Sequence, residues 1–323
     1  MNVLFTFDVE IWCNSWSTLD EDFPASFDRY VFGRSAKGEY ALPKILDTLG
    51  THGLKGVFFV EPLFAAHFGV EYLKIIVRLI QDAGQEVQLH LHPEWTDEAR
   101  DAPLLENVTV KRQHLTQYSI DEQQVLIKHG LRLLQEAGCI PPPVAFRSGS
   151  FSCNEDTFSA VTMNGLRFDS SINPQMEESQ PGDIAPVYAN PYEVFTRNEL
   201  TLIPMSSFCD GFGQNRHAQI GACSAREITQ ALEDAVRKQW HTFVLLSHGF
   251  ELMVPGRNTC DPFVERRFTH VCRFLAANRL TMPTVNFSDL SVFPDPCNAP
   301  LPAVRKLATV RRYAEQALRR LYQ

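Results

Sequence analysis

Acidic side chains follow the first apolar run of this chain, and their spacing suits hydrolytic chemistry. Asp8 and Glu10 come at the end of the run 3–7. Two carboxylates placed two residues apart on a strand point to the same face, where they could share a metal ion and a proton transfer. Taken alone, such a pair more often caps the loop that follows a strand.

Histidines end a second apolar run. His90 and His92 alternate onto one side of the predicted strand 86–90, and Glu94 follows within reach. Two imidazoles reach one divalent ion in this way. A single strand histidine is more often a core residue, but a pair with a nearby carboxylate favours a metal site.

Two further runs end in polar groups, Arg147 followed by Ser148 in one case and His248 in the other. A buried arginine needs a carboxylate partner, for which Asp8 is the candidate, because an unpaired buried charge is costly. His248 alone fits a core histidine as well as a catalytic one. Four strands that each deliver an ionisable group at the carboxyl end seldom arise by accident, so the set predicts a catalytic site.

The elements that must position these residues alternate along the chain. We predict strands at 2–8, 55–60, 86–90, 143–147, 200–205, 242–247 and 281–286. We predict helices at 39–52, 70–83, 120–137, 155–164, 224–239 and 261–278. About seven βα units indicate an α/β fold with a barrel or barrel-like sheet, whose active residues lie at the carboxyl ends of the strands.

Two long stretches, 11–38 and 93–119, show no clear helix or strand pattern and contain aromatic residues. Loops of this length are usually lids or binding loops, with irregular packing against the barrel as an equal alternative. We predict that Trp12 and Trp95 in these stretches, together with Ser148, bind the substrate.

The end of the chain has a different pattern, and we divide the chain into a barrel, 1–292, and a tail, 293–323. Prolines between 294 and 302 form a linker, and apolar residues then recur at helical spacing over 303–322 among six basic residues. The pattern predicts a basic amphipathic helix. Such a helix docks on an acidic barrel or lies on a membrane surface.

Composition narrows the class of protein. The chain has 323 residues, a formal net charge of −8 and an apolar fraction of 44%, which allow one large domain and argue against a nucleic-acid partner. Its eight cysteines form no CxxC pair, which indicates a reducing compartment. With no signal peptide or long apolar span, we expect a cytoplasmic protein, peripheral to the inner membrane if the tail is an anchor.

The motifs together resemble the polysaccharide deacetylases of NodB-homology type, carbohydrate esterase family 4. The segments that carry the resemblance are 6–10, 86–94, 146–147, 166–171, 202–204 and 246–248. They occur in the family's order from about residue 2 to about residue 290. Within the family the chain is most similar to the WalW-like branch linked to lipopolysaccharide biosynthesis.

This resemblance implies a distorted (β/α)7 barrel that removes an N-acetyl group from a sugar or glycan, free or lipid-linked. It implies Asp8 as the base, His248 as the acid, and Arg147 as the group that holds Asp8 ionised. The divalent ion, for which we predict zinc, would be bound by Glu10 and His90 with one further ligand.

Two positions depart from the family pattern. Val9 stands where members commonly have the metal-binding acid, so Glu10 takes that role. Glu94 stands where the second histidine ligand commonly lies, so either His92 or Glu94 completes the site. We predict His92, because imidazole is the better zinc ligand, with Glu94 bonded to it.

Two other functions remain open. The lack of an acid at Val9 suggests a hydrolase that acts without metal or on a cyclic amide. The aromatic stretch 11–38 suggests a glycan-binding relative without activity. The presence of Asp8, Arg147 and His248 together argues against the second, because a binding protein needs neither an acid nor a base.

Overall fold

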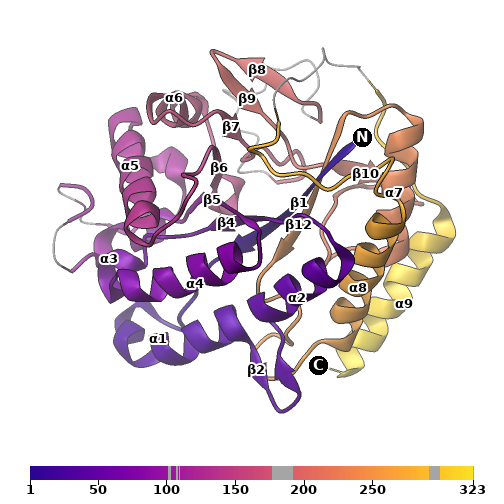
Figure 1. Cartoon of the computed structure of the whole chain (residues 1–323), viewed down its shortest axis with the longest axis horizontal. Helices are drawn as coiled ribbons and strands as arrows, with labels where there is room; N and C mark the ends of the chain where they lie inside the picture. The colour runs from indigo at the N-terminus through magenta and orange to yellow at the C-terminus, as the bar shows by residue number, and fades with distance from the viewer. Residues whose placement is uncertain (101–102, 107, 109, 177–191, 291–298, 323) are drawn as a thin grey trace. The chain divides into compact units, whose positions relative to one another are not determined.

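The computed structural model of the chain describes residues 1–100, 103–106, 108, 110–176, 192–290 and 299–322. The chain folds as two compact units. Unit 1 comprises 1–56, 206–285 and 299–323, and unit 2 comprises 57–205 and 286–298. Both units combine helices with parallel strands, so the fold is mixed α/β (Figure 1).

Unit 1 is built on two parallel strands, β1 (Asn2–Val9) and β12 (Thr242–His248). They pair in register from Asn2 opposite Thr242 to Asp8 opposite His248. Helices of the unit include α2 (Leu42–His52), α7 (Ala225–Arg237) and α8 (Pro262–Ala277). A short hairpin is formed by β10 (Ser207–Cys209) and β11 (Asn215–His217). The register therefore brings the two predicted catalytic residues to the same end of the strand pair.

The predicted strand at 281–286 is wrong for the described residues. Thr284 forms only an isolated bridge to Val3. The Val3 amide donates to the Pro283 carbonyl at 2.9 Å, and the Val285 amide donates to the Val3 carbonyl at 3.0 Å. Because Pro283 has no amide hydrogen, it interrupts the donor pattern that a longer ladder needs.

The prediction of irregular structure over 11–38 is also wrong. This stretch contains η1 (Trp16–Thr18), α1 (Leu19–Phe27), the π-helix η2 (Asp28–Phe32), β2 (Arg34–Ser35) and β3 (Gly38–Glu39). Phe23, Phe27 and Val31 are buried at helical spacing. Gly33 ends the helix at a φ of 58°, and a Cβ there would meet the Ala41 amide nitrogen at 2.7 Å.

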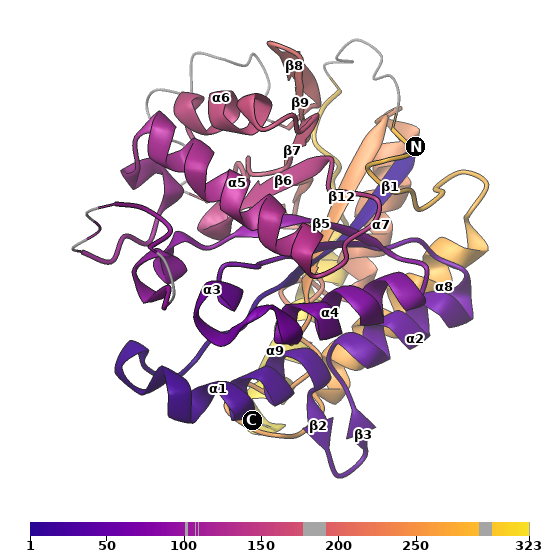
Figure 2. The ribbon, with the colours of Figure 1, turned by 60° about the vertical axis from the view of Figure 1, so that its left-hand side comes forward.

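Unit 2 has the strand order β4-β5-β6-β7-β9-β8. The strands are β4 (Val57–Val60), β5 (Glu86–Leu91), β6 (Ala145–Ser148), β7 (Phe168–Asp169), β9 (Leu200–Leu202) and the antiparallel β8 (Phe195–Arg197). The helices are α3 (Ala65–Phe68), α4 (Val70–Asp82), α5 (Ile120–Glu136) and α6 (Glu155–Met163), of which α4 and α5 lie beside β5 (Figure 2). The described parts of 93–119 contain the 3-10 turns η3 (Pro93–Glu98) and η4 (Leu115–Gln117). The parallel register sets His90 opposite Arg147 near the carboxyl ends of β5 and β6.

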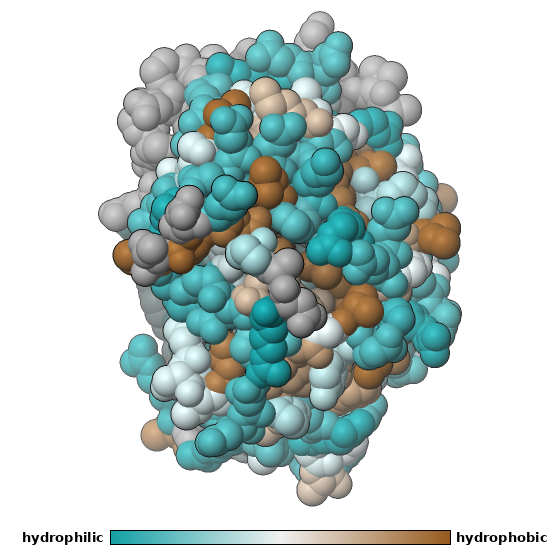
Figure 3. All heavy atoms as spheres, turned by 90° about the vertical axis from the view of Figure 1, so that its left-hand side faces the viewer, coloured by the Kyte–Doolittle hydropathy of each residue, from teal (hydrophilic) through white to brown (hydrophobic). Residues whose placement is uncertain are grey.

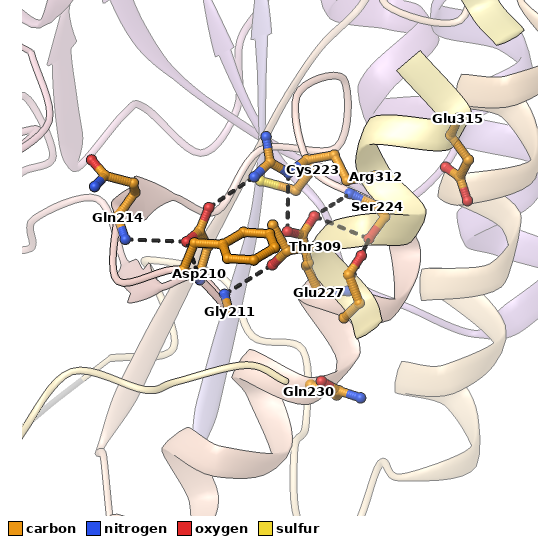
Figure 4. A network of polar contacts seen from close by, with 12 residues as sticks. Asp210, Gly211, Gln214, Cys223, Ser224, Glu227, Gln230, Thr309, Arg312 and Glu315 are labelled. Carbon is orange, nitrogen blue, oxygen red and sulfur yellow. Dashed lines mark hydrogen bonds and ion pairs between the residues drawn. The ribbon is translucent and has the colours of Figure 1, made fainter. Parts of the chain in front are cut away.

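The predicted C-terminal helix is α9 (Lys306–Tyr322), which belongs to unit 1; residues 293–298 of the predicted linker lie outside the described residues. The helix docks through polar contacts (Figure 4). Arg312 Nη2 lies 2.8 Å from Asp210 Oδ2, and its Nε lies 3.0 Å from Glu227 Oε1. The Gly211 amide donates to Thr309 Oγ1 at 2.9 Å. The docked face of the helix is therefore its polar face.

The surface of the chain is mixed in character. On the face in Figure 3, apolar side chains are scattered among hydrophilic ones, which is ordinary for a globular protein. The seven cysteines among the described residues are free thiols. In the described part of the chain, no helix is both long and apolar enough to span a membrane.

Candidate active site

Unit 1 places a carboxylate and an imidazole side by side. Asp8 and His248 are register partners on β1 and β12, and Asp8 is buried. His248 Nε2 lies 3.7 Å from Glu10 Oε1. Three ionisable groups predicted from the sequence thus lie together at the carboxyl end of the strand pair.

A residue that the sequence interpretation missed holds His248 in place. His248 Nδ1 lies 3.1 Å from Glu251 Oε1. Glu251 also accepts hydrogen bonds from Ser247 Oγ at 2.9 Å, from the Gly221 amide at 3.0 Å and from Gln219 Nε2. A carboxylate three residues after a candidate catalytic histidine was the available signal.

The charge state of His248 follows from these neighbours. Burial by itself lowers the pKa of His248, but the hydrogen bond and charge of Glu251, with the charges of Glu10 and Asp8, outweigh burial and raise the pKa to about 9. The imidazole is therefore protonated at neutral pH. A protonated imidazole beside a carboxylate can act as a general acid.

A pocket of about 330 Å³ in unit 1 is lined by Glu251 and Gln219 together with aromatic side chains. Tyr30 and Phe250 lie edge to face with ring centroids 5.1 Å apart, and the Phe250 ring lies 5.3 Å from that of His248. The sequence interpretation did not identify these two aromatic residues as a pair. They lie near His248 only because the fold places Tyr30 and Phe250 next to each other.

In unit 2, the two predicted histidine ligands lie next to each other. The rings of His90 and His92 meet edge to face with centroids 4.8 Å apart. His90 Nδ1 donates to the Arg147 carbonyl at 2.8 Å, which leaves Nε2 as the nitrogen that can bind a metal ion. His92 Nδ1 lies 3.3 Å from Glu94 Oε2. The hydrogen bond of His90 matches the way proteins orient histidine ligands, and His92 lies beside it with its Nδ1 near a carboxylate, so the pair fits a divalent ion.

Gly149 leaves room for His92. A Cβ on Gly149 would lie 2.6 Å from His92 Nδ1, although the backbone angles of this glycine would tolerate alanine. The next two residues, Ser150 and Phe151, have φ values of 53° and 55°, a strained conformation for side chains of this size. The turn after β6 is therefore shaped around the imidazole.

Gly149→Ala is expected to weaken divalent-metal binding by about 10- to 100-fold, because the new methyl group displaces His92 from its place beside His90. The measurement is metal affinity by competition with a chelator. Gly50→Ala is the matched control, since nothing lies within 4 Å of a Cβ at Gly50. Equal affinities in the two variants would contradict the steric role of Gly149.

The predicted residues at the end of β6 are both buried. Arg147 is fully buried, donates from Nη2 to Ser170 Oγ at 3.2 Å and stacks over Phe59 at 4.1 Å. The amide of Ser148 donates to Ser171 Oγ at 2.9 Å. The carboxylate predicted to pair with Arg147 belongs to unit 1, so that pairing stays a prediction.

The predicted substrate-binding tryptophans have different environments. Trp12 is partly exposed and lies edge to face with Trp16 at 6.4 Å. Trp95 is only 1% exposed and packs in unit 2 against Phe64 and Phe68. Contact of either indole with a substrate stays a prediction, as does that of Ser148.

Two buried carboxyl groups of unit 2, Glu61 and Asp169, were given no role from the sequence, although Asp169 lies in the motif segment 166–171. Desolvation raises the pKa of Glu61 to about 8, although amides of Leu63 and Phe64 donate to it. Desolvation likewise raises the pKa of Asp169 to about 7, against hydrogen bonds from Ser171. Glu61 directly follows the apolar strand β4, which is the signal that drew attention to the other strand ends.

Comparison with known proteins establishes the fold. No family model and no curated protein matches the chain. A Mycobacterium smegmatis protein assigned as a polysaccharide deacetylase is similar in structure, with 20% identity, a TM-score of 0.55 and coverage of 89% of this chain and 87% of that one. The 4-α-glucanotransferase of Thermococcus litoralis has 12% identity and a TM-score of 0.54 over 93% of this chain and 42% of that one. At these identities the likeness concerns the fold alone, and the count of seven βα units stays a prediction.

Proposed function

We propose that this chain is a metal-dependent hydrolase that removes an N-acetyl group from a sugar or glycan. The observation that carries the proposal is the pairing of Asp8 with His248 at the ends of adjacent strands, since amide hydrolysis needs both a base and an acid. The fold by itself does not choose the reaction, because it is shared with both a polysaccharide deacetylase and a glucanotransferase. The choice therefore depends on the side chains.

For the metal ion we propose Glu10, His90 and His92 as ligands, which offer one carboxylate and two imidazoles. Glu94 then serves as the partner of His92, in keeping with its position 3.3 Å from Nδ1. A divalent ion such as zinc supplies Lewis-acid activation of water and of the acetyl carbonyl when bound.

The protein's own groups then handle the protons. Asp8 accepts a proton from the attacking water, and the role that we propose for Arg147 is to pair with the Asp8 carboxylate. His248 donates a proton to the departing sugar nitrogen, which leaves poorly unless it is protonated. Glu251 keeps His248 oriented and charged. Each proton transfer is thereby assigned to a named side chain.

We place the sugar near Tyr30 and Phe250, whose rings offer apolar surfaces beside the proposed acid. Trp12 remains a further candidate contact. The finer proposal, carried by the sequence resemblance, is an N-acetylated glycan, free or lipid-linked, in surface polysaccharide or lipopolysaccharide biosynthesis.

The function is tested by acetate release from a panel of N-acetylated sugars, free and lipid-linked, after chelation and after addition of zinc or cobalt. We expect acetate release that chelation removes and metal restores. Release that persists in fully demetallated protein would support a metal-independent hydrolase instead. Binding of the glycans without any acetate release would support a non-catalytic relative.

His90→Ala tests whether His90 is a metal ligand. We expect loss of both bound metal and acetate release, because His90 is proposed to bind the ion directly. The control is His241→Ala, which changes an exposed histidine. A His90→Ala protein with full metal content and activity would overturn the ligand assignment.

Glu251→Gln is expected to lower kcat by less than the ~10²- to 10⁴-fold contributed by a general acid, with KM little changed. Removing the carboxylate lowers the pKa of His248, so the alkaline limb of the kcat profile should move to lower pH. Initial rates of acetate release across pH measure both effects. Glu233→Gln, at an exposed position on α7, is the control, and an unshifted alkaline limb in Glu251→Gln would contradict the positioning role.

A further inference from the structure

A second pocket in unit 1, about 310 Å³ in volume, lies among α7, α8 and α9 and is lined mainly by basic side chains. Its ionisable lining residues are Arg226 of α7, Arg266, Arg267 and His270 of α8, and Arg311 and Glu315 of α9. Four arginines thus face one carboxylate, a formal excess of three positive charges with the histidine neutral. The whole chain, by contrast, has a net charge of −8.

Arg267 has one donor that the protein leaves unused. The residue is 3% exposed, and it donates from Nε to Glu315 Oε2 at 2.9 Å and from Nη1 to the Gly221 carbonyl at 3.2 Å. Its Nη2 is buried and has no hydrogen-bond partner among the described residues. Buried donors are nearly always paired, so an unpaired guanidinium nitrogen in a residue that lines the pocket indicates that the described residues do not supply all the acceptors this arginine can use.

The remaining charges of the pocket are not neutralised internally. Glu315 is already shared, because Arg311 Nε lies 3.1 Å from one of its oxygens while Arg267 bonds to the other. Arg226 and Arg266 are exposed and form no ion pair within the described part of the chain. The pocket therefore offers several guanidinium groups to a ligand that carries more than one negative charge.

We propose that this pocket binds the phosphate group of a phosphorylated ligand. Guanidinium groups match the oxygen geometry of phosphate through paired hydrogen bonds. A phosphate dianion also offsets more of the positive excess of the pocket than a singly charged carboxylate ligand would. The volume is within the range of small-ligand pockets and holds a phosphate with a small group attached. This role goes beyond the hydrolytic site and does not depend on turnover.

The phosphate can belong to a soluble ester or to a phospholipid headgroup. The exposed face of α9 favours the phospholipid headgroup. Leu307, Leu318 and Leu321 are exposed on this helix, which borders the pocket. Exposed apolar side chains beside basic ones are the features of a helix that rests on an anionic membrane. The two sources are distinguished by separate binding measurements.

Isothermal titration of the full chain with inorganic phosphate and with pyrophosphate tests the soluble source, in chloride buffer of fixed ionic strength. Sedimentation with phosphatidylcholine vesicles, with and without phosphatidic acid, tests the lipid source. The variant is Arg226→Ala with Arg266→Ala, two exposed residues whose loss should leave the fold intact. The control is Arg78→Ala, an exposed arginine of α4 outside the pocket.

We expect binding in at least one of the two measurements, weakened by about tenfold or more in the double variant and unchanged in Arg78→Ala, since charge-assisted hydrogen bonds are lost. Binding of phosphate or pyrophosphate identifies a soluble ligand. Binding only to vesicles with phosphatidic acid identifies a lipid headgroup. Absence of binding in both measurements, or equal binding by the double variant, would overturn the proposal.

Discussion

Asp8→Asn is expected to lower kcat for acetate release by at least ~10²- to 10⁴-fold while the metal content stays normal. The amide has nearly the shape of the carboxylate, so buried Asp8 can be replaced without a cavity. It cannot accept the proton of the attacking water, and the proposed ligands Glu10, His90 and His92 are unchanged. Steady-state rates and metal analysis of the same preparation measure the two properties together.

Asp47→Asn is the control for this substitution, because Asp47 is an exposed residue of α2. Near wild-type turnover by Asp8→Asn would show that Asp8 is not the base. Loss of metal together with activity would instead make Asp8 a metal ligand. The proton-transfer role therefore needs the combination of normal metal content and lost turnover.

Much of the candidate site could be predicted because strand ends are local features of a sequence. The apolar runs that became β1, β5, β6 and β12 each stop at an ionisable residue. Parallel pairing then sets Asp8 opposite His248, and His90 opposite Arg147. Local patterning thus selected the residues, and the parallel register aligned them within each unit.

Other parts of the site depend on contacts distant in the chain. The spacing of Glu251 from His248 is visible in the sequence, but Gln219 and Gly221, which also bond to the Glu251 carboxylate, are not. The pocket beside it pairs Tyr30 with Phe250 across more than two hundred positions of sequence. No periodicity within a window of the sequence contains that information.

Helix α9 shows a different limit of sequence patterning. Its amphipathic spacing predicted a helix, yet the spacing could not determine which face would dock. In the structure, Ala308, Thr309 and Arg312 are buried while Leu307 and Leu321 are exposed. Asp210 and Glu227, far away in the sequence, decide this orientation because their buried carboxylates require a cation.

Arg312→Ala is therefore expected to destabilise the protein by about 3–5 kcal/mol, because it leaves two buried carboxylates without their cation. Figure 4 shows Arg312 bonded to both Asp210 and Glu227. Urea unfolding, with the slope compared between variants, measures the change in free energy. For the same reason, a chain truncated before α9 would lose stability and is unsuitable for testing membrane contact.

Arg311→Ala, one position earlier on α9, is the matched control. The Arg311 side chain is 64% exposed and pairs with Glu315, which is 20% exposed and so less buried than Asp210 and Glu227. Loss of Arg311 should therefore cost only about 0–1 kcal/mol. Combining Arg312→Met with Asp210→Asn and Glu227→Gln should recover most of the lost stability, because no buried charge is then left uncompensated. If Arg312→Ala and Arg311→Ala unfolded at the same urea concentration, the buried ion pairs would not be what holds α9 in place.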